Sequence, residues 1–481
     1  MKLDELFRTN GDHKEWASTD IRGLCYDSRR AEPGFAFFAI SGTADDGHRY
    51  IEDAMERGAC ALIVERRLDL KTDIPQLVVA NARRALANAA RKFYCDPSFE
   101  MTVAAVTGTN GKTSIVYLSR HILSHSGIQS GLMSTVMVDD GKRKETATHT
   151  TPESLEIQSL LSEMRRNGLT HALMEASSHA LDQGRLAGLK LASGVFTNLT
   201  PDHLDYHRDM SHYLASKARL FEMLHGDAFA VLNREDPVSL KLASRSLARP
   251  LWFGMGEKVD VHAAVHDCSS EGTRLTLTAP DGSAEIFTSL VGLHNVENIL
   301  AATANAHALG IPFDIVCAAI ESFSGTPGRL QRVECGQPFT VLIDYAHTQD
   351  ALEKVLQALV SLRGDGRLLL VFGCGGDRDK SKRPQMGKAA SRYADEFWVT
   401  SDNPRSEDPK AIIDDILNGI NGTPCHVEAD RRAAIQDAIK HAAPSDIVLI
   451  AGKGHEDYQI IGNEKFHFDD AEEAASVLSS Q

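Results

Sequence analysis

The chain has 481 residues, 42% of them hydrophobic and 24% charged, and its formal net charge is −15 at pH 7. These values are typical of a soluble globular protein, and the length indicates about three domains rather than one hydrophobic core. The acidic balance argues against non-specific binding to nucleic acid, so a negatively charged substrate would need a local basic site.

The cysteines and the apolar segments narrow the class further. The eight cysteines are scattered and none belongs to a C-x-x-C pair, which excludes a zinc ribbon and a thioredoxin motif. Free thiols fit a reducing cytoplasm. We find no signal peptide and no apolar run of about 18 residues that would span a membrane. The sequence therefore predicts a cytoplasmic protein with neither a membrane nor a nucleic-acid partner.

Residues 1–98 predict a small α/β unit. Apolar runs at 35–40 and 61–64 are expected to form strands, and the alanine- and arginine-rich stretch 81–94 is expected to form a helix. Cys95-Asp-Pro-Ser is a plausible linker to the next unit.

The stretch 103–114, VAAVTGTNGKTS, predicts a phosphate-binding loop. Its apolar start is typical of a buried strand, and a helical pattern begins at Lys112. Backbone N–H groups of the glycine loop would surround phosphate oxygens at the helix N-terminus, Lys112 would reach the outer phosphates, and the Thr113 hydroxyl would face a magnesium ion. Val106 replaces the first glycine of the usual G-x-x-x-x-G-K-[ST] pattern, and a plain glycine turn is the alternative. The expected ATP contacts here are Gly108, Thr109, Asn110, Gly111, Lys112, Thr113 and Ser114.

Between residues 99 and 330 strands alternate with helices, which predicts a mainly parallel sheet with its ligands at the carboxyl ends of the strands. Residues 258–290 depart from this pattern and predict an antiparallel hairpin. Glu175 ends one strand and is a candidate magnesium ligand, with an N-cap or surface acid as the alternative. The polar residues 177–179 that follow favour the functional interpretation.

Three histidines, His203, His207 and His212, resemble a zinc cluster in spacing only. They lack nearby cysteines and the His-Glu-x-x-His helix, so one histidine near a nucleotide-bound metal is favoured over zinc. Lys217 lies in an expected helix at 209–225 and, by its position alone, is an ordinary helical lysine.

The loop at 325–330 predicts a boundary, after which a third α/β unit with four strands begins. Each of these strands leaves polar residues at its carboxyl end, as in a Rossmann-like doubly wound sheet. Basic side chains there suit a carboxylate, and Glu456 suits an ammonium. A solvated charge run is the alternative for 380–383, but not for Arg405. The basic residues are Arg378, Lys380, Lys382, Arg383 and Arg405.

Taken together, these motifs resemble the ATP-dependent Mur ligases of peptidoglycan synthesis over nearly the whole chain. The similar segments are 107–113 (TGTNGKT), 198–207 (NLTPDHLDYH), 294–298 (HNVEN), 344–347 (DYAH) and 452–458 (GKGHEDY). The segment 402–405, Asp-Asn-Pro-Arg, resembles the signature of the members that add meso-diaminopimelate to UDP-N-acetylmuramoyl-L-alanyl-D-glutamate, whereas lysine-adding members usually lack that arginine.

The resemblance implies three α/β domains: a UDP-binding domain at 1–98, a central P-loop-type ATPase domain at 99–330, and an amino-acid-binding domain at 331–481. The UDP end would contact Tyr26, Ser28, Thr43, Ala44 and Asp45. The muramoyl-peptide would contact Thr150, Thr151, Ser177, Gln183 and Arg185. Catalysis with ATP and two magnesium ions would involve Lys112, Thr113, Glu175, His203 and Lys217, the last as a carbamate derived from CO₂. Further nucleotide contacts would be Asn295, Asn298, Arg329 and Asp344. Diaminopimelate would contact Arg378, Asp402, Asn403, Pro404, Arg405, Gly452 and Glu456.

Two positions depart from the family pattern: His149 stands where asparagine is expected, and Gln349 stands where proline is expected. The implied reaction forms an acyl phosphate that an amine of diaminopimelate attacks, with closure of the third domain expected before the chemistry. No obligate protein partner is evident. Folylpolyglutamate synthase is the nearest rival, although it usually has Gly-Ser after the loop lysine and lacks this first domain. A nucleotide-binding regulator without catalysis is the rival from another class.

Overall fold

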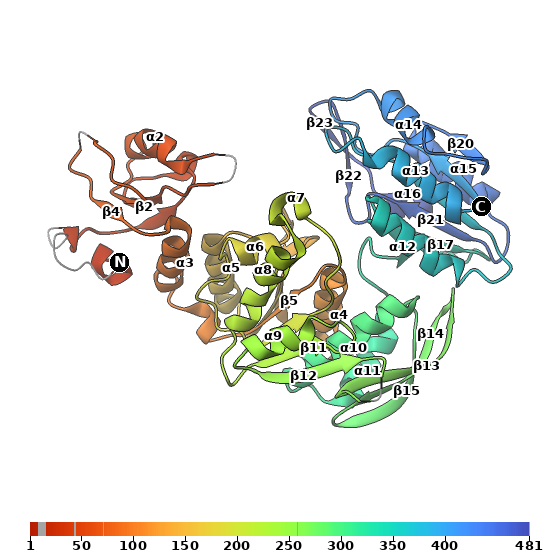
Figure 1. The fold of residues 1–481 in the computed structure, drawn as a ribbon, viewed down its shortest axis with the longest axis horizontal. Helices are drawn as coiled ribbons and strands as arrows, with labels where there is room; N and C mark the ends of the chain where they lie inside the picture. The colour runs from red at the N-terminus through yellow and green to blue at the C-terminus, as the bar shows by residue number, and fades with distance from the viewer. Residues whose placement is uncertain (8–15, 43–44, 71, 257, 481) are drawn as a thin grey trace. The chain divides into compact units, whose positions relative to one another are not determined.

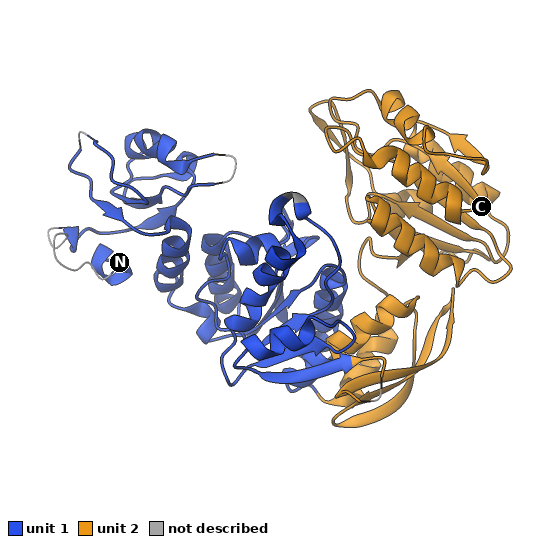
Figure 2. Cartoon of the chain, viewed as in Figure 1, with its two compact units in different colours: residues 1–253, 304–311 blue, residues 254–303, 312–481 orange. Residues whose placement is uncertain are grey.

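The structure is a computed structural model that describes residues 1–7, 16–42, 45–70, 72–256 and 258–480. The candidate residues Thr43 and Ala44 lie outside this described part. The chain forms two compact units, shown in Figure 2: one contains residues 1–253 and 304–311, and the other contains residues 254–303 and 312–481. In the described part of the chain, no helix is long and apolar enough to cross a membrane.

The first unit begins with a small parallel sheet, as the sequence predicts. Its strands follow in chain order: β1 (Gly23–Cys25), β2 (Phe35–Phe38), β3 (Ala61–Val64) and β4 (Gln76–Val78). The helices are α1 (Leu3–Phe7), α2 (Ile51–Glu56) and α3 (Ala82–Phe93). The expected helix at 81–94 is confirmed, and Asn81 caps it by accepting a hydrogen bond from the Arg84 N–H at 2.8 Å.

The first unit continues with the main sheet (Figure 1). The strands, in order across the sheet, are β12 (Arg249–Gly254), β11 (Phe229–Asn233), β10 (Ser193–Phe196), β5 (Thr102–Thr107), β9 (His171–Glu175), β6 (Ser130–Met133), β7 (Met137–Asp139) and β8 (Lys144–Thr146). All neighbouring pairs from β12 to β6 are parallel, and β7 and β8 add antiparallel edge strands. The helices are α4 (Lys112–His125), α5 (Ser154–Arg166), α6 (Ser178–Asp182), α7 (Leu204–His207), α8 (Met210–Glu222) and α9 (Ser239–Arg245).

The register of this sheet fixes where the candidate site lies. Val106 pairs with Glu175, and Thr107 pairs with Phe196, so β5, β9 and β10 end at the same level. Because the glycine loop follows β5 directly, the side chains that follow β9 and β10 lie beside it.

The second unit starts with the antiparallel strands β13 (Val261–Ser269), β14 (Gly272–Ala279) and β15 (Gly282–Thr288), which confirms the expected hairpin. Helix α10 (Leu293–Ala308) follows, with residues 304–308 counted in the first unit, and then helix α11 (Phe313–Ser322). The next sheet has the order β16 (Gln331–Arg332), β17 (Thr340–Asp344), β21 (Ile447–Ala451), β18 (Leu368–Phe372), β19 (Glu396–Val399) and β20 (Cys425–Val427).

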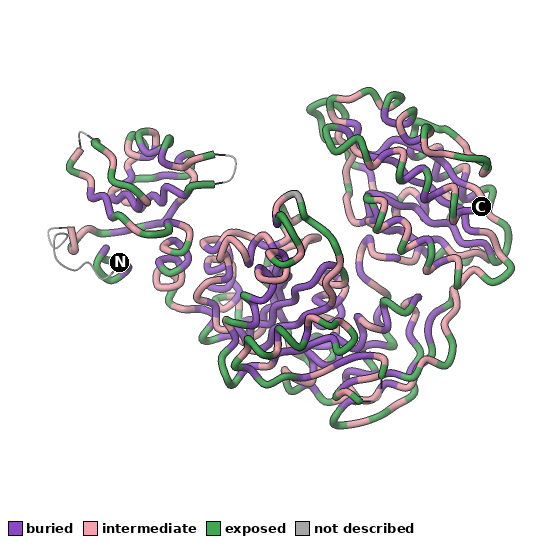
Figure 3. The backbone as a smooth tube through the Cα atoms, viewed as in Figure 1, coloured by how far each residue is buried: buried purple, intermediate pink, exposed green. Residues whose placement is uncertain are grey.

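This last sheet is doubly wound and parallel from β17 to β20. Its helices are α12 (Gln349–Val360), α13 (Lys382–Tyr393), α14 (Pro409–Leu417), α15 (Arg431–His441) and α16 (Asp470–Leu478), and a hairpin of β22 (Tyr458–Ile461) and β23 (Glu464–His467) precedes α16. Successive residues of β18 pack on opposite faces of the sheet. Leu370 packs with α12–α14, and Val371 packs with α15 and α16. Figure 3 shows the strands as the buried layer. The Rossmann-like prediction is confirmed, whereas the boundaries at 98 and 330 stay predictions.

Candidate active site

The glycine loop after β5 has a backbone that other residues cannot easily adopt. Gly108 has φ +148°, and a Cβ there would lie 1.7 Å from Thr197 Oγ1. Segments after β10 hold the loop: Thr197 Oγ1 donates to Asn110 O (2.6 Å), and Asn110 N donates to Asn198 Oδ1 (3.0 Å). Val106 lies inside β5 and is fully buried, so no glycine is required at that position. The loop is thus a preformed cradle at the N-terminus of α4.

Two lysines converge on this loop. Lys112 Nζ donates to the carbonyl oxygens of Gly108 (3.0 Å) and Thr109 (2.9 Å). Lys217 Nζ, from α8, donates to the same Gly108 oxygen at 2.7 Å. Lys112 therefore lies folded over the loop, where its charge can meet a bound phosphate.

Lys217 is not the ordinary helical lysine that its position alone predicts. It is 1% exposed, and its Nζ lies 4.4 Å from the centre of the Tyr213 ring. Burial, and then the nearby charge of Lys112, lowers the pKa of Lys217 well below its usual value. The side chain is therefore biased towards the neutral amine.

Glu175 is fully buried at the end of β9. Its Oε1 accepts a hydrogen bond from Thr135 N (2.8 Å) and its Oε2 accepts one from Thr135 Oγ1 (3.1 Å). The same Thr135 oxygen lies 3.1 Å from Thr150 Oγ1. The side chain that caps α6 is that of Ser177. The alternatives of a surface acid or an N-cap for Glu175 are therefore wrong. The sequence reasoning missed Thr135, which nothing in the motifs marks.

The histidines do not form a zinc site. His207 is buried, with its Nε2 2.9 Å from Ser178 Oγ, and burial lowers its pKa to about 4. His203 is exposed, with its Nε2 3.5 Å from Asp202 Oδ2. Within the described ranges, no group of three or more His, Cys, Asp or Glu side chains could hold a metal.

The expected muramoyl-peptide residues form one hydrogen-bonded cluster. Thr151 Oγ1 donates to Ser177 Oγ (3.2 Å), and Arg185 donates to Thr151 O (2.8 Å) and to Gln183 Oε1 (2.7 Å from Nη2). Glu153 Oε1 lies 3.2 Å from Arg185 Nε and also accepts from Arg83 Nη1 (2.6 Å). The structure thus brings Thr150, Thr151, Ser177, Gln183 and Arg185 together beside the phosphate loop.

The expected UDP-binding residues are in the small N-terminal sheet. Tyr26 follows β1 and donates to Glu156 Oε1 (3.0 Å), whereas Ser28 is buried and Asp45 is exposed. The hydrogen bond from Tyr26 to α5 ties this sheet to the main sheet's helices within the first unit.

In the second unit, the expected nucleotide residues lie at two places. Asn295 Nδ2 donates to Val291 O (2.9 Å), and Asn298 Nδ2 donates to Asn295 Oδ1 (3.1 Å). Asp344 is buried at the end of β17 and accepts from the N–H groups of residues 330 and 346; burial raises its pKa. Arg329 lies over the Tyr345 ring at 4.8 Å, and its buried Nε has no hydrogen-bond partner among the described residues.

The segment 402–405 follows β19 and meets the hairpin of β22 and β23. Arg405 has a left-handed backbone (φ +53°), and its N–H donates to Ile460 O (3.0 Å). Its Nη1 donates to Gly376 O (2.8 Å), which holds the guanidinium beside the glycines after β18. A Cβ on Gly376 would lie 1.9 Å from Pro404 O, so this approach requires glycine.

An acidic cluster adjoins Arg405. Asn403 Nδ2 donates to Glu456 Oε2 (2.8 Å), and a Cβ on Gly452 would lie 2.9 Å from Asp402 Oδ2. Burial and the charge of Asp402 raise the pKa of Glu456. The buried Lys453 completes the cluster. The sequence reasoning missed this lysine, although a lysine between two glycines at a strand end is a signal that could have marked it.

The basic run after β18 divides into different roles. Arg378 is exposed. Arg383 is fully buried and pairs with Glu407 (2.8 Å) and Asp415 (2.8 Å), and Lys380 also pairs with Glu407 (3.0 Å). The alternative of a solvated charge run is wrong for Arg383, because the side chain is fully buried and its two terminal nitrogens pair with carboxylates of the protein.

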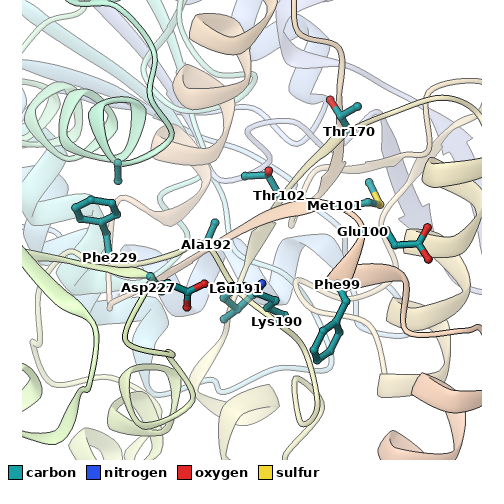
Figure 4. A pocket seen from close by; sticks show the side chains of 12 residues that line it. Phe99, Glu100, Met101, Thr102, Thr170, Lys190, Leu191, Ala192, Asp227 and Phe229 are labelled. Carbon is teal, nitrogen blue, oxygen red and sulfur yellow. Dashed lines mark ion pairs between the residues drawn. The ribbon is translucent and has the colours of Figure 1, made fainter.

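A cavity of about 420 Å³ lies at the opposite end of the strands of the main sheet, where the strands begin (Figure 4). Thr102 and Phe229 begin β5 and β11 there, and Lys190 lies 3.8 Å from Asp227. Ligands of open α/β sheets bind at the carboxyl ends of the strands, and this cavity is at the amino ends. None of the candidate residues that the structure describes lines it.

Known sequences and structures resemble this chain along its whole length. Residues 20–94 match "Mur ligase family, catalytic domain", 106–306 match "Mur ligase middle domain", and 328–454 match "Mur ligase, glutamate ligase domain". A UDP-N-acetylmuramoyl-L-alanyl-D-glutamate–2,6-diaminopimelate ligase of Bacillus velezensis is 44% identical over 99% of both chains.

Two solved structures are also similar. One, a UDP-N-acetylmuramoyl-L-alanyl-D-glutamate–2,6-diaminopimelate ligase, is 34% identical with a TM-score of 0.74, covering 100% of this chain and 99% of its own. The other, a Mycobacterium tuberculosis folylpolyglutamate synthase complexed with ADP, has a TM-score of 0.62 over 77% of this chain and 92% of its own. At 19% identity, this similarity shows only that the two proteins share a fold. With its three matched segments and a full-length relative at 44% identity, the chain belongs to the Mur ligase family.

Proposed function

We propose that the chain is an ATP-dependent, ADP-forming ligase that joins meso-diaminopimelate to the D-glutamyl carboxylate of UDP-N-acetylmuramoyl-L-alanyl-D-glutamate, in peptidoglycan precursor synthesis. The observation that carries this proposal is the segment 402–405, where the Arg405 guanidinium is held at Gly376 O and its charge lowers the pKa of Glu456. The Glu456 carboxylate in turn accepts a hydrogen bond from Asn403 of the same segment. An amino acid with both a carboxylate and an ammonium at its far end matches this site, because the carboxylate can pair with Arg405 and the ammonium can pair with Glu456. The 44% identity to a diaminopimelate ligase over 99% of the chain supports the same assignment.

The residues divide by ligand as the resemblance implies. The glycine loop, Lys112 and Thr113 bind the phosphates of ATP, while Asn295, Asn298, Arg329 and Asp344 contact the nucleotide. The Thr151–Arg185 cluster binds the muramoyl-peptide. The UDP end is bound by Tyr26, Ser28, Thr43, Ala44 and Asp45. The amino acid is bound by Arg378, Asp402, Asn403, Pro404, Arg405, Gly452 and Glu456.

The chemistry follows from the poor leaving group of a carboxylate. A D-glutamyl carboxylate oxygen attacks the γ-phosphorus of ATP, ADP departs, and an acyl phosphate forms. The amine of diaminopimelate then attacks the acyl carbon and loses a proton; inorganic phosphate departs and an amide remains. The ammonium of Lys112, held at the loop carbonyls, offsets the charge that concentrates on the transferred phosphoryl group.

The side chains at the loop fit magnesium. The Thr113 hydroxyl and the Glu175 carboxylate are buried oxygen donors of the kind that Mg²⁺ prefers, and the buried hydroxyls of Thr107 and Thr200 have no hydrogen-bond partner in the described ranges. His203 is the expected ligand from the segment after β10. When bound, the metal would neutralise charge on the phosphates.

Lys217 is the proposed site of a carbamate that supports a second magnesium ion. A buried neutral amine can attack the carbon of CO₂ and release a proton, which leaves an N-linked carboxylate. An ammonium beside two metal ions would be repulsive, whereas a carbamate supplies oxygens of the right sign.

We also propose a cytoplasmic location. All eight cysteines are free, which fits a reducing compartment.

The test is the mass of the product after incubation with ATP, UDP-N-acetylmuramoyl-L-alanyl-D-glutamate and either diaminopimelate or lysine. We expect the diaminopimelate adduct and an equal amount of ADP. Folate polyglutamylation would instead support the rival ligase, and nucleotide binding without hydrolysis would support a regulator.

A further inference from the structure

Lys453 is fully buried directly after β21, although an ammonium is costly to bury unless charges and hydrogen bonds compensate it. Its Nζ lies 3.8 Å from Asp402 Oδ1 and 3.8 Å from Glu456 Oε2. The same Nζ donates hydrogen bonds to Asn403 Oδ1 (3.4 Å) and to the carbonyl oxygen of Tyr458. The cation therefore contacts three of the side chains that line the amino-acid site.

The contact with Asn403 determines which way this amide points. Asn403 Oδ1 accepts from Lys453 Nζ and from Ile460 N (2.9 Å), so Nδ2 is left to donate to Glu456 Oε2 (2.8 Å). If the amide turned over, its NH₂ group would face two donors. Lys453 and the Ile460 N–H thus both favour this orientation of Asn403, which in turn orients the carboxylate of Glu456.

The charges of this cluster also depend on Lys453. Burial and then Asp402 raise the pKa of Glu456, whereas Lys453 and Arg405 lower it. Other groups that face Glu456 are Tyr345, Tyr458 and Arg431, and Arg431 forms a buried ion pair with Asp470 (2.7 Å). Burial lowers the pKa of Lys453 itself, and the charges of Asp402 and Glu456 counteract that effect. When ionised, Lys453 offsets one of these two carboxylate charges and leaves the other to receive a substrate ammonium.

We propose that Lys453 is a positioning residue for the amino-acid site, which holds Asn403 and Glu456 in the arrangement that receives the substrate's far ammonium. The proposal rests on the proposed function, since it takes diaminopimelate as the amino acid. Lys453 acts through its neighbours and does not contact the substrate.

The experiment compares Lys453→Met with Lys465→Met as a matched control. Lys465 is an exposed lysine of the adjoining hairpin, with its Nζ 3.7 Å from the centre of the Tyr458 ring. In Lys453→Met the KM for diaminopimelate should rise by about 30-fold or more, as for loss of one partner of a buried charge pair, while the KM values for ATP and the UDP-linked substrate stay unchanged. Lys465→Met should match the wild type.

The pH profile separates positioning from packing. Without the Lys453 charge the pKa of Glu456 rises, so the KM of Lys453→Met for diaminopimelate should fall as the pH rises, over a range above that of the wild type. An unchanged KM, or a parallel change of all three KM values with a lower Tm and no new pH dependence, would overturn the proposal. Lys453→Gln serves in the same assays if the methionine variant does not fold.

A readout without substrate keeps the two proposals separable. A wild type that ligates no diaminopimelate would refute the proposed function. In that case, ¹³C NMR titration of Glu456 and a crystal structure of Lys453→Met still test whether Lys453 positions Asn403 and Glu456. A raised pKa and a reoriented Asn403 amide support the positioning role, whereas an unchanged cluster overturns it.

Discussion

The ammonium groups of Lys112 and Lys217 meet at one backbone atom, the carbonyl oxygen of Gly108, at 3.0 and 2.7 Å. Two positive charges so close repel each other, and after burial the Lys112 charge is the next cause of the lowered pKa of Lys217. Lys217 is the one that is fully buried, so its pKa is the one that burial lowers. This difference in burial is the physical basis for the two proposed roles, Lys112 at the phosphates and Lys217 as the carbamate.

Replacing Lys112 by alanine should cripple ligation and leave the fold intact. Its ammonium donates to two carbonyl oxygens of the loop, so its loss removes charge from the transition state rather than core packing. Losing one such contact typically lowers kcat by about 10²–10³-fold. ADP release in the presence of both co-substrates measures the effect, and Lys142→Ala, at an exposed turn, is the control. Wild-type rates in Lys112→Ala would contradict the phosphate-loop assignment.

Lys217→Ala should be nearly inactive and partly restored by added short carboxylic acids, because these can supply the missing carboxylate oxygens. Activity of the wild type should also rise with bicarbonate, and ¹³C-labelled bicarbonate should give a carbamate NMR signal that Lys217→Ala lacks. A bare ammonium at Lys217 in a crystal grown with bicarbonate, together with full activity, would refute the carbamate.

His207 should make the protein less stable in acid. Its pKa is lowered to about 4 in the folded chain, from an ordinary value of 6.5, because burial disfavours the imidazolium. Between these two values the unfolded chain binds a proton that the folded chain does not, so stability rises with pH through this window and levels off above it.

The comparison of Tm against pH for the wild type and His207→Gln isolates this effect, since other titrating groups are common to both. The wild type should show the steeper loss of Tm between pH 6.5 and 4, because glutamine binds no proton there. Parallel curves would mean that His207 charges in the folded state without cost.

Arg405 should make the enzyme select diaminopimelate over lysine. The two amino acids differ at the far end, where lysine lacks the carboxylate. With lysine bound, the guanidinium would be desolvated and unmatched, and such a mismatch can discriminate by about 10⁴–10⁵. Arg405→Ala should therefore raise the KM for diaminopimelate steeply and narrow the gap to lysine, without creating a good lysine enzyme.

Arg405→Lys should fail as well, because an ammonium cannot reproduce the two parallel N–H donors. The measurement is kcat/KM for both amino acids in the wild type and both variants. If the wild type uses lysine equally well, or if the alanine variant keeps full selectivity, Arg405 does not set the choice.

Much of the fold could be predicted from local pattern. The apolar runs at 103–106 and 447–451 have the length and composition of buried parallel strands, and both are strands of the structure. The glycine loop was recognisable because Gly108 and Gly111 both adopt positive φ, which few other residues allow. Side chains at the carboxyl end of a strand, such as Glu175, could be placed because the parallel strands end side by side.

Long-range contacts could not be predicted in this way. Thr135 holds Glu175 across 40 residues of sequence, and Lys453 reaches Asn403 across 50. The sequence left two interpretations open for Arg383, a ligand contact and a solvated charge run, because nothing local to it shows that it pairs with Glu407 and Asp415. Burial of a charge depends on partners that only the tertiary fold supplies.

The left-handed backbone at Arg405 has an evolutionary consequence. This conformation costs a non-glycine residue about 1–2 kcal/mol, so selection for folding alone favours glycine or asparagine at that position. We therefore infer that arginine is kept at position 405 for its proposed role in selecting the amino acid. Relatives that add a different amino acid are expected to differ at this position, where the backbone itself favours another residue.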